Sequence, residues 1–204
     1  MSNLTNDCPS SFHCEERLVS WKIANVLEDA LPKNYNEIIL LFIGTDRSTG
    51  DSFGPLTGTL LQAKLIKHFH IFGTLKEPVH AKNIQSSLTY INKHHNNPFI
   101  IAIDAALGQT DQIKTFKIGN GGLEPGAAFN KQIPPVGDLN VKGFVNTGGF
   151  LQLAVLQSTR LSHIMEMSET FAQAISLLDS RLKRKNKLKV TSLNDKSFLT
   201  KTEV

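Results

Sequence analysis

Residues 38–55, IILLFIGTDRSTGDSFGP, constrain the fold of this chain more than any other segment. Six apolar residues, 38–43, run directly into a loop with three glycines and two aspartates. A short continuous apolar run bounded by turn residues is typical of a buried strand in a parallel sheet. The loop therefore follows the carboxyl end of a strand, which is the edge where ligands bind in open α/β sheets.

The segments around this loop alternate between helical and strand patterns. Apolar spacing predicts helices at residues 15–31, from residue 55 onward and at 85–95, and strands at 79–82 and 99–103. This β-α-β-α-β order is typical of a parallel sheet with right-handed crossovers. Two more strands, 113–118 and 139–145, flank a Gly- and Pro-rich loop. Residues 150–185 are predicted to form a helical segment whose apolar stripe packs on the sheet, with a second subunit as the alternative. We expect an α/β fold, a three-layer αβα sandwich with a mostly parallel sheet.

The length of 204 residues and the apolar content of 40% suit one domain with a substantial core. We expect a disordered N-terminal arm at 1–14, a single α/β domain at 15–187 and a basic, disordered tail at 188–204. No apolar run approaches the roughly 20 residues that cross a bilayer. The N-terminus has neither the basic nor the apolar region of a secretory signal. These features predict a cytoplasmic protein with no membrane partner.

The net charge of +4 is concentrated at the C-terminus. From Arg181 onward, eight Lys or Arg residues stand against two acids, so this tail carries +6 and the rest of the chain −2. A basic cluster can bind nucleic acid, but it also suits a helix C-terminus. The body of the chain lacks the basic face and interleaved aromatic residues of a nucleic-acid binder. Nucleic acid is therefore not an expected partner.

Asp51 in the first loop and Asp104 at the end of strand 99–103 are the candidate catalytic residues. If strands 38–43 and 99–103 are neighbours, as in a 2-1-3 strand order, both carboxylates face one crevice. Two nearby carboxylates repel, so one keeps its proton while the other is ionised, and such a pair can activate a water and protonate a leaving group. The pair can instead bind a divalent cation. Each aspartate can also cap a helix or a turn, and the sequence leaves these alternatives open.

Known motifs for phosphate binding, nucleophilic catalysis and zinc binding match this sequence less well. The first loop lacks GK[ST] and the spacing of GxGxxG, and no serine lies in a G-x-S-x-G context. Asp46 is typical of a turn that bonds its own backbone. Cys8 and Cys14 are one Cys pair without a second ligand pair, which is a weak zinc signal. His80 and His163 can each serve as a ligand, but a structural role is expected for both. Four more histidines are expected on helices or their ends, exposed to solvent: His68, His70, His94 and His95.

The segments GTDRSTGDSFGP, IAIDAALG, EPGAAFNKQIPPVGD and NTGGF resemble the YyaC-type sporulation proteins of spore-forming Firmicutes. The resemblance covers residues 15–181. That family is similar to the germination protease, which degrades small acid-soluble spore proteins, and in fold to the hydrogenase maturation proteases. The germination protease has one catalytic aspartate in a D-x-x-G-P loop and one at an I-D-A strand end, which match Asp51 and Asp104. In the hydrogenase proteases, acids at these places bind nickel with a later histidine, and no histidine here matches that ligand.

The resemblance implies a sporulation-associated endopeptidase, an aspartic-type hydrolase of the germination-protease kind, in the mother cell or forespore. Asp51 and Asp104 would act on a water that attacks a peptide carbonyl, and the loop 119–138 would offer N–H groups to the oxyanion. The expected partner is a peptide or protein substrate, with spore proteins as candidates. Further substrate or loop contacts are expected from Asp46, Gly50, Gly54, Asn130 and Lys131.

The alternative is a non-catalytic sporulation protein that binds a peptide or a metal-bound ligand in the same cleft. No cofactor is expected, apart from a divalent metal considered at the two aspartates. The sequence predicts no oligomeric state.

Overall fold

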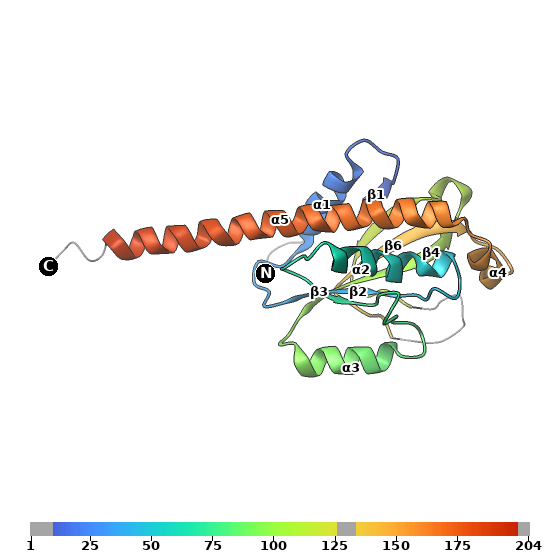
Figure 1. The fold of residues 1–204 in the computed structure, drawn as a ribbon, viewed down its shortest axis with the longest axis horizontal. Helices are drawn as coiled ribbons and strands as arrows, with labels where there is room; N and C mark the ends of the chain where they lie inside the picture. Colours follow the sequence, from blue (N-terminus) through green and yellow to red (C-terminus); the bar gives the residue numbers. More distant parts are fainter. Residues whose placement is uncertain (1–9, 126–133, 200–204) are drawn as a thin grey trace.

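A computed structural model describes residues 10–125 and 134–199, with side chains described up to residue 185. One six-stranded sheet forms the centre of the molecule, between helices on both faces (Figure 1). The strand order is β1-β5-β6-β4-β2-β3. β3, β2, β4 and β6 run parallel, whereas β5 is antiparallel to both of its neighbours. The strands are β1 (Ser10–His13), β2 (Ile38–Phe42), β3 (His70–Phe72), β4 (Phe99–Gly108), β5 (Thr115–Asn120) and β6 (Leu139–Thr147).

Three helices cover one face of the sheet and one covers the other, which makes three layers (Figure 1). The first face carries α1 (Val19–Ala30), α2 (Phe53–Ala63) and α5 (Leu161–Leu199), and the second carries α3 (Ile84–His94). The remaining elements are short: η1 (Gly50–Ser52), η2 (Thr110–Gln112) and α4 (Gln152–Gln157). The predicted α/β sandwich with a mostly parallel sheet is confirmed.

The two hydrophobic clusters explain why β2 is apolar throughout. Leu40 and Phe42 pack with α1, α2 and α5, whereas Ile39 and Leu41 pack with α3. All five residues of β2 are fully buried, as expected for a strand covered on both faces. A continuous apolar run was therefore the correct signal for this strand.

The predicted strand neighbours are correct, but the second strand is a different segment. β2 pairs in parallel with β4, which confirms the 2-1-3 order. The strand on the other side of β2 is β3, at residues 70–72, and not the predicted segment 79–82. That segment makes only an isolated bridge between Val79 and Ile43, because the chain turns immediately afterwards.

Both predicted disordered ends are partly wrong. Residues 10–13, placed in a disordered arm, form β1 along β5, and the adjoining Cys14 is buried. Long-range pairing and burial of this kind leave no local sequence pattern. The tail predicted from residue 188 continues as helix α5 to Leu199, because residues 161–199 contain no proline or glycine to end the helix. Residues 1–9 and 200–204 lie outside the described part of the chain.

Within the described residues, none of the helices has a stretch that is both long and apolar enough to span a bilayer.

Candidate active site

Asp51 is held at the end of β2 by a tight turn. Gly44 has a φ of +137°, and a Cβ at this position would lie 2.0 Å from the backbone oxygen of Asp51. Only glycine allows both this φ and this approach. The N–H of Thr45 donates a hydrogen bond to the same oxygen at 3.1 Å. The loop thus folds back on itself and fixes η1, which carries Asp51, beside the end of the strand.

Asp51 does not cap the helix that follows it. The N-cap residues are Thr49 for η1 and Ser52 for α2, and neither makes a side-chain capping bond within the described structure. The capping alternative raised by the sequence is therefore not what positions Asp51.

Asp104 lies inside β4 and not at its end, which corrects the predicted strand boundary at residue 103. β4 continues to Gly108 because β6 pairs with it as far as Thr147. The other neighbour, β2, stops earlier, and its last residue Phe42 is paired with Ile103. Asp104 is thus the first residue of β4 beyond the end of β2.

Asp51 and Asp104 line the same cavity, which has a volume of about 650 Å³. Its walls come from the loop after β2, the carboxyl-end half of β4, residues of β5 and β6, the segment from His80 to Lys82, and α4. The strand order predicted that these two carboxylates would face one crevice, and the structure brings them together there. The cavity is large enough for several residues of an extended peptide.

The cavity raises the pKa of both acids. Burial raises the pKa of Asp51 to about 6, and the backbone amide of Thr45 partly opposes this. Burial also raises the pKa of Asp104 well above its ordinary value, and the nearby charge of Asp51 raises it further. The backbone amide of Ala105 and the charge of Lys142 act in the opposite direction. Near neutral pH this favours a charged Asp51 beside a protonated Asp104, which is the state required of a base and an acid.

Basic side chains surround the two acids. Lys142 is the cross-strand partner of Asp104 on β6, and Lys117 pairs with Lys142 from β5. Arg47 and Lys82 also line the cavity. Glu124 is a third acid in its wall. Because Asp104 favours its protonated form, these four cations outnumber the ionised acids, and the cavity attracts negatively charged groups.

Ser48 has an unusual environment in the cavity wall. The residue is 6% exposed, and its hydroxyl oxygen has no hydrogen-bond partner among the described residues. A buried hydroxyl without a partner is costly, and such groups are often found at functional sites. Ser48 is therefore a candidate contact for a polar group of a ligand.

The other residues predicted to contact a substrate do not line the cavity within the described part of the chain. A Cβ on Gly54 would lie 2.3 Å from the carbonyl oxygen of Ile43, and one on Gly50 would lie 2.8 Å from Leu156 Cδ2, so both glycines serve close packing. Asp46 is exposed and does not line the cavity. The loop 119–138 contributes to the wall through three described residues, Gly119, Leu123 and Glu124. Asn130 and Lys131 lie outside the described residues.

Sequence reasoning missed several residues of this wall. His80 lines the cavity because the bridge between Ile43 and Val79 brings the next residue to its rim. Lys142 is adjacent to Asp104 only through the register of β4 and β6. Neither position has a motif around it, so only the strand pairing could have identified them.

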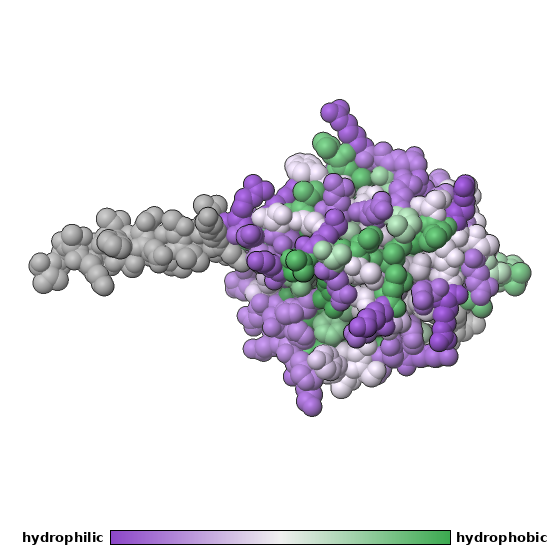
Figure 2. All heavy atoms as spheres, viewed as in Figure 1, coloured by the Kyte–Doolittle hydropathy of each residue, from purple (hydrophilic) through white to green (hydrophobic). Residues whose placement is uncertain are grey.

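Exposed apolar side chains lie on α4 and in the residues that flank it, and one of them reaches the cavity. Four large apolar residues around α4 are exposed, and Leu153 also lines the cavity. Apolar atoms are visible at the end of the molecule that α4 occupies (Figures 1 and 2). Clustered exposed apolar side chains are typical of surfaces that bind another polypeptide. These residues, named the α4 rim below, are Phe150, Leu151, Leu153 and Leu161.

His80 and Glu124 line the same cavity as the two aspartates, but among the described residues no third ligand lies close enough to share an ion with both. Within the described residues, the one group of three His, Cys, Asp or Glu side chains with ligand atoms close enough to share an ion lies elsewhere and contains neither aspartate. The residues present therefore do not fit the two-acid and histidine nickel site of the hydrogenase proteases.

The family described as "Protein of unknown function (DUF1256)" matches residues 11–174 of this chain. A curated relative, "Uncharacterized protein YyaC" of Bacillus subtilis (strain 168), is 45% identical over 168 residues, which are 82% of each chain. Among solved structures, the [NiFe] hydrogenase maturation protease HycI of Thermococcus kodakarensis KOD1 is similar, with a TM-score of 0.51 and 19% identity. The similarity covers 76% of this chain and 99% of that protein, and it concerns the fold.

Proposed function

The chain belongs to the DUF1256 family, together with the YyaC protein of Bacillus subtilis, and from this premise we propose that it is a peptidase in which Asp51 and Asp104 are the acid/base pair. The observation that carries the proposal is the placement of both aspartates in one cavity, each with a raised pKa. The fold it shares with a hydrogenase maturation protease is compatible with such an activity.

In the proposed mechanism, the charged Asp51 carboxylate takes a proton from a water that attacks the peptide carbonyl carbon. The protonated Asp104 then donates its proton to the leaving amine nitrogen, and the C–N bond breaks. The charge of Lys142, which lowers the pKa of Asp104, stabilises the Asp104 carboxylate that this step leaves behind. A second proton transfer, from Asp51 back to Asp104, restores the starting state.

The surroundings of the cavity favour a polypeptide substrate. The α4 rim offers apolar contacts beside the cavity, and the four cations favour a segment that carries acidic side chains or a terminal carboxylate. We propose a protein made during sporulation as the substrate, in the cytoplasm of the mother cell or forespore, because the motifs of the chain resemble those of sporulation proteins.

A cleavage assay tests the proposal. Wild type, Asp51→Asn and Asp104→Asn would be incubated with proteins extracted from sporulating cells, and the products identified by mass spectrometry. Asp111→Asn is the matched control, because Asp111 is exposed and does not line the cavity. We expect cleavage by wild type and Asp111→Asn, and loss of at least about 100-fold in the two cavity variants. Equal cleavage by all four proteins, with folding unchanged, would refute the role of the pair.

A second candidate function is the binding of a peptide without cleavage, and the exposed α4 rim favours it. In that case none of the four proteins cleaves. The same extract passed over immobilised wild type would then retain a polypeptide, and Leu153→Ser would release it. Retention that is unaffected by this substitution would exclude the rim as the binding surface.

A further inference from the structure

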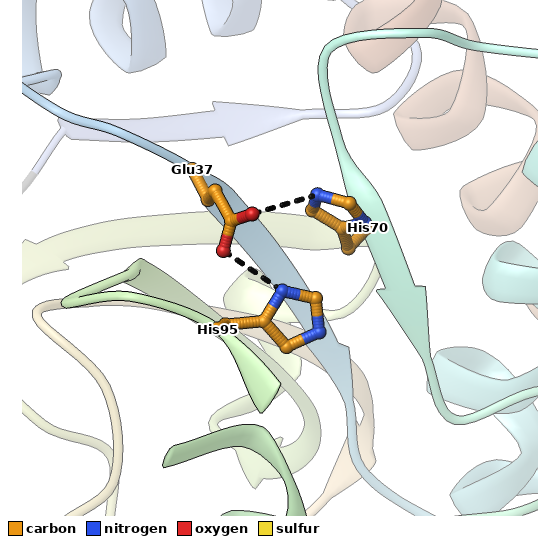
Figure 3. A group of neighbouring side chains, drawn as sticks. All are labelled: Glu37, His70 and His95. Atoms are coloured by element: carbon orange, nitrogen blue, oxygen red, sulfur yellow. Dashed lines mark hydrogen bonds and ion pairs between the residues drawn. The ribbon is translucent and has the colours of Figure 1, made fainter. Parts of the chain in front are cut away.

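A second cluster of polar side chains lies at the opposite edge of the sheet from Asp51 and Asp104. Glu37 precedes β2, His70 begins β3 and His95 follows α3 (Figure 3). These are the amino ends of the parallel strands, whereas the two aspartates lie at the carboxyl ends. The cluster is thus a separate feature of the fold.

The register of the sheet explains why these residues meet. Ile39 faces the α3 layer, and side chains two residues apart in a strand share a face, so Glu37 faces the same layer. His70 is the cross-strand partner of Ile39 and faces it too. His95 immediately follows α3, in that same layer. Three distant parts of the chain therefore bring their side chains to one point.

The distances among these side chains suit a shared ion. His95 Nδ1 lies 2.9 Å from Glu37 Oε2, and His70 Nε2 lies 3.9 Å from Glu37 Oε1 (Figure 3). The ligand atoms of all three residues lie within 4.8 Å of one another. In a tetrahedral zinc site with bonds of about 2.0–2.1 Å, ligand atoms are about 3.4 Å apart. The two measured distances bracket this value, and the side chains of Glu37 and His70, 33% and 50% exposed, are free to adjust.

We propose that Glu37, His70 and His95 form a binding site for a divalent transition-metal ion of the zinc class. Two imidazole nitrogens and one carboxylate are a ligand set that zinc uses in proteins, with water in the fourth position. Both histidines also line a cavity of about 980 Å³, which leaves space for that water. The ion would join the starts of β2 and β3 to the end of α3. It would thereby secure β3, an edge strand of only three residues.

Zinc binding to the metal-free full-length protein tests the site. We expect calorimetry to show one site of micromolar or tighter affinity, and zinc to raise the unfolding temperature. Co²⁺ should give the visible absorption of a four-coordinate site, without the near-ultraviolet band of thiolate ligands that binding to cysteine would produce. His95→Gln keeps a donor for Glu37 but loses the imidazole, and it should weaken zinc binding at least about 100-fold, since even outer-shell changes cost 10–100-fold.

Matched controls separate this site from others in the chain. His94→Gln changes the neighbouring histidine, which is exposed and bonds to the carbonyl of Tyr90, and it should bind zinc like wild type. Asp51→Asn should also bind zinc like wild type, because Asp51 lies at the other edge. His70→Asn provides a second ligand variant, and circular dichroism without zinc checks that each protein is folded. No stoichiometric binding by wild type, or equal affinity in the ligand variants and controls, would overturn the proposal.

Discussion

Replacing Asp51 by Asn should stabilise the protein at neutral pH. Burial raises the pKa of this carboxyl from 3.8 to about 6, so the folded state holds the proton more tightly than the unfolded state does. Ionising Asp51 therefore costs folding free energy. This cost is absent below about pH 4 and complete above about pH 6. A pKa difference of about 2 corresponds to about 3 kcal/mol, because each pKa unit is worth about 1.4 kcal/mol.

An amide has the same shape as the carboxylate and carries no charge, so Asp51→Asn removes this cost. Because Asp51 is partly exposed to the cavity, we expect a gain of about 1–3 kcal/mol. The assay is urea unfolding. The gain in the free energy of unfolding should be present at about pH 7.5 and nearly absent at about pH 4. The matched control Asp111→Asn should change stability by less than about 0.5 kcal/mol at both. A loss of stability at about pH 7.5, or the same gain at both pH values, would refute the reasoning.

Four further predictions concern single residues. Lys142→Met removes a charge that lowers the pKa of Asp104, so the basic limb of the cleavage–pH profile should move to higher pH. An unchanged basic limb would contradict the interaction between Lys142 and Asp104. Gly54→Ala places a Cβ 2.3 Å from a backbone oxygen and should cost about 1–3 kcal/mol by urea unfolding, against little for Ala at exposed Gly149. Phe171→Ala empties a site between two other phenylalanine rings and should cost about 3–5 kcal/mol in the same assay, and a cost below about 1 kcal/mol would argue against this packing. Burial, with the charge of Glu166, raises the pKa of the Cys14 thiol to about 12, so mass spectrometry should find Cys14 unmodified by iodoacetamide until the protein is unfolded.

The sequence predicted the elements that carry strong local patterns. β2 is a continuous apolar run, and the loop after it contains the glycines that a tight turn requires. The positions of β2 and of Asp51 therefore followed from the local residue pattern alone. The placement of Asp104 beside Asp51 followed from the strand order of parallel α/β sheets. These two inferences were sufficient to locate the cavity.

Features that depend on long-range pairing could not be predicted. β1 and β3 have four and three residues, and their sequences SSFH and HIF resemble loop segments until a neighbouring strand pairs with them. His70 was accordingly expected on a helix or its end, whereas it starts β3 and lies near Glu37; its predicted exposure to solvent is confirmed. Pairing of β4 with β6 determines that Lys142 is adjacent to Asp104, and neither segment encodes this alone.

The two aspartates differ in how firmly the fold holds them. Asp104 belongs to a central strand paired with β6 on one side and, up to the preceding residue, with β2 on the other. Asp51 stands on a turn closed by a few backbone hydrogen bonds, among them Thr45 to Asp51 and Ser52 to Thr49. Amide hydrogens around Asp104 should exchange with solvent only when the whole domain unfolds, and those around Asp51 through local opening. On warming, the cavity should therefore lose its geometry from the Asp51 side while the core is still intact.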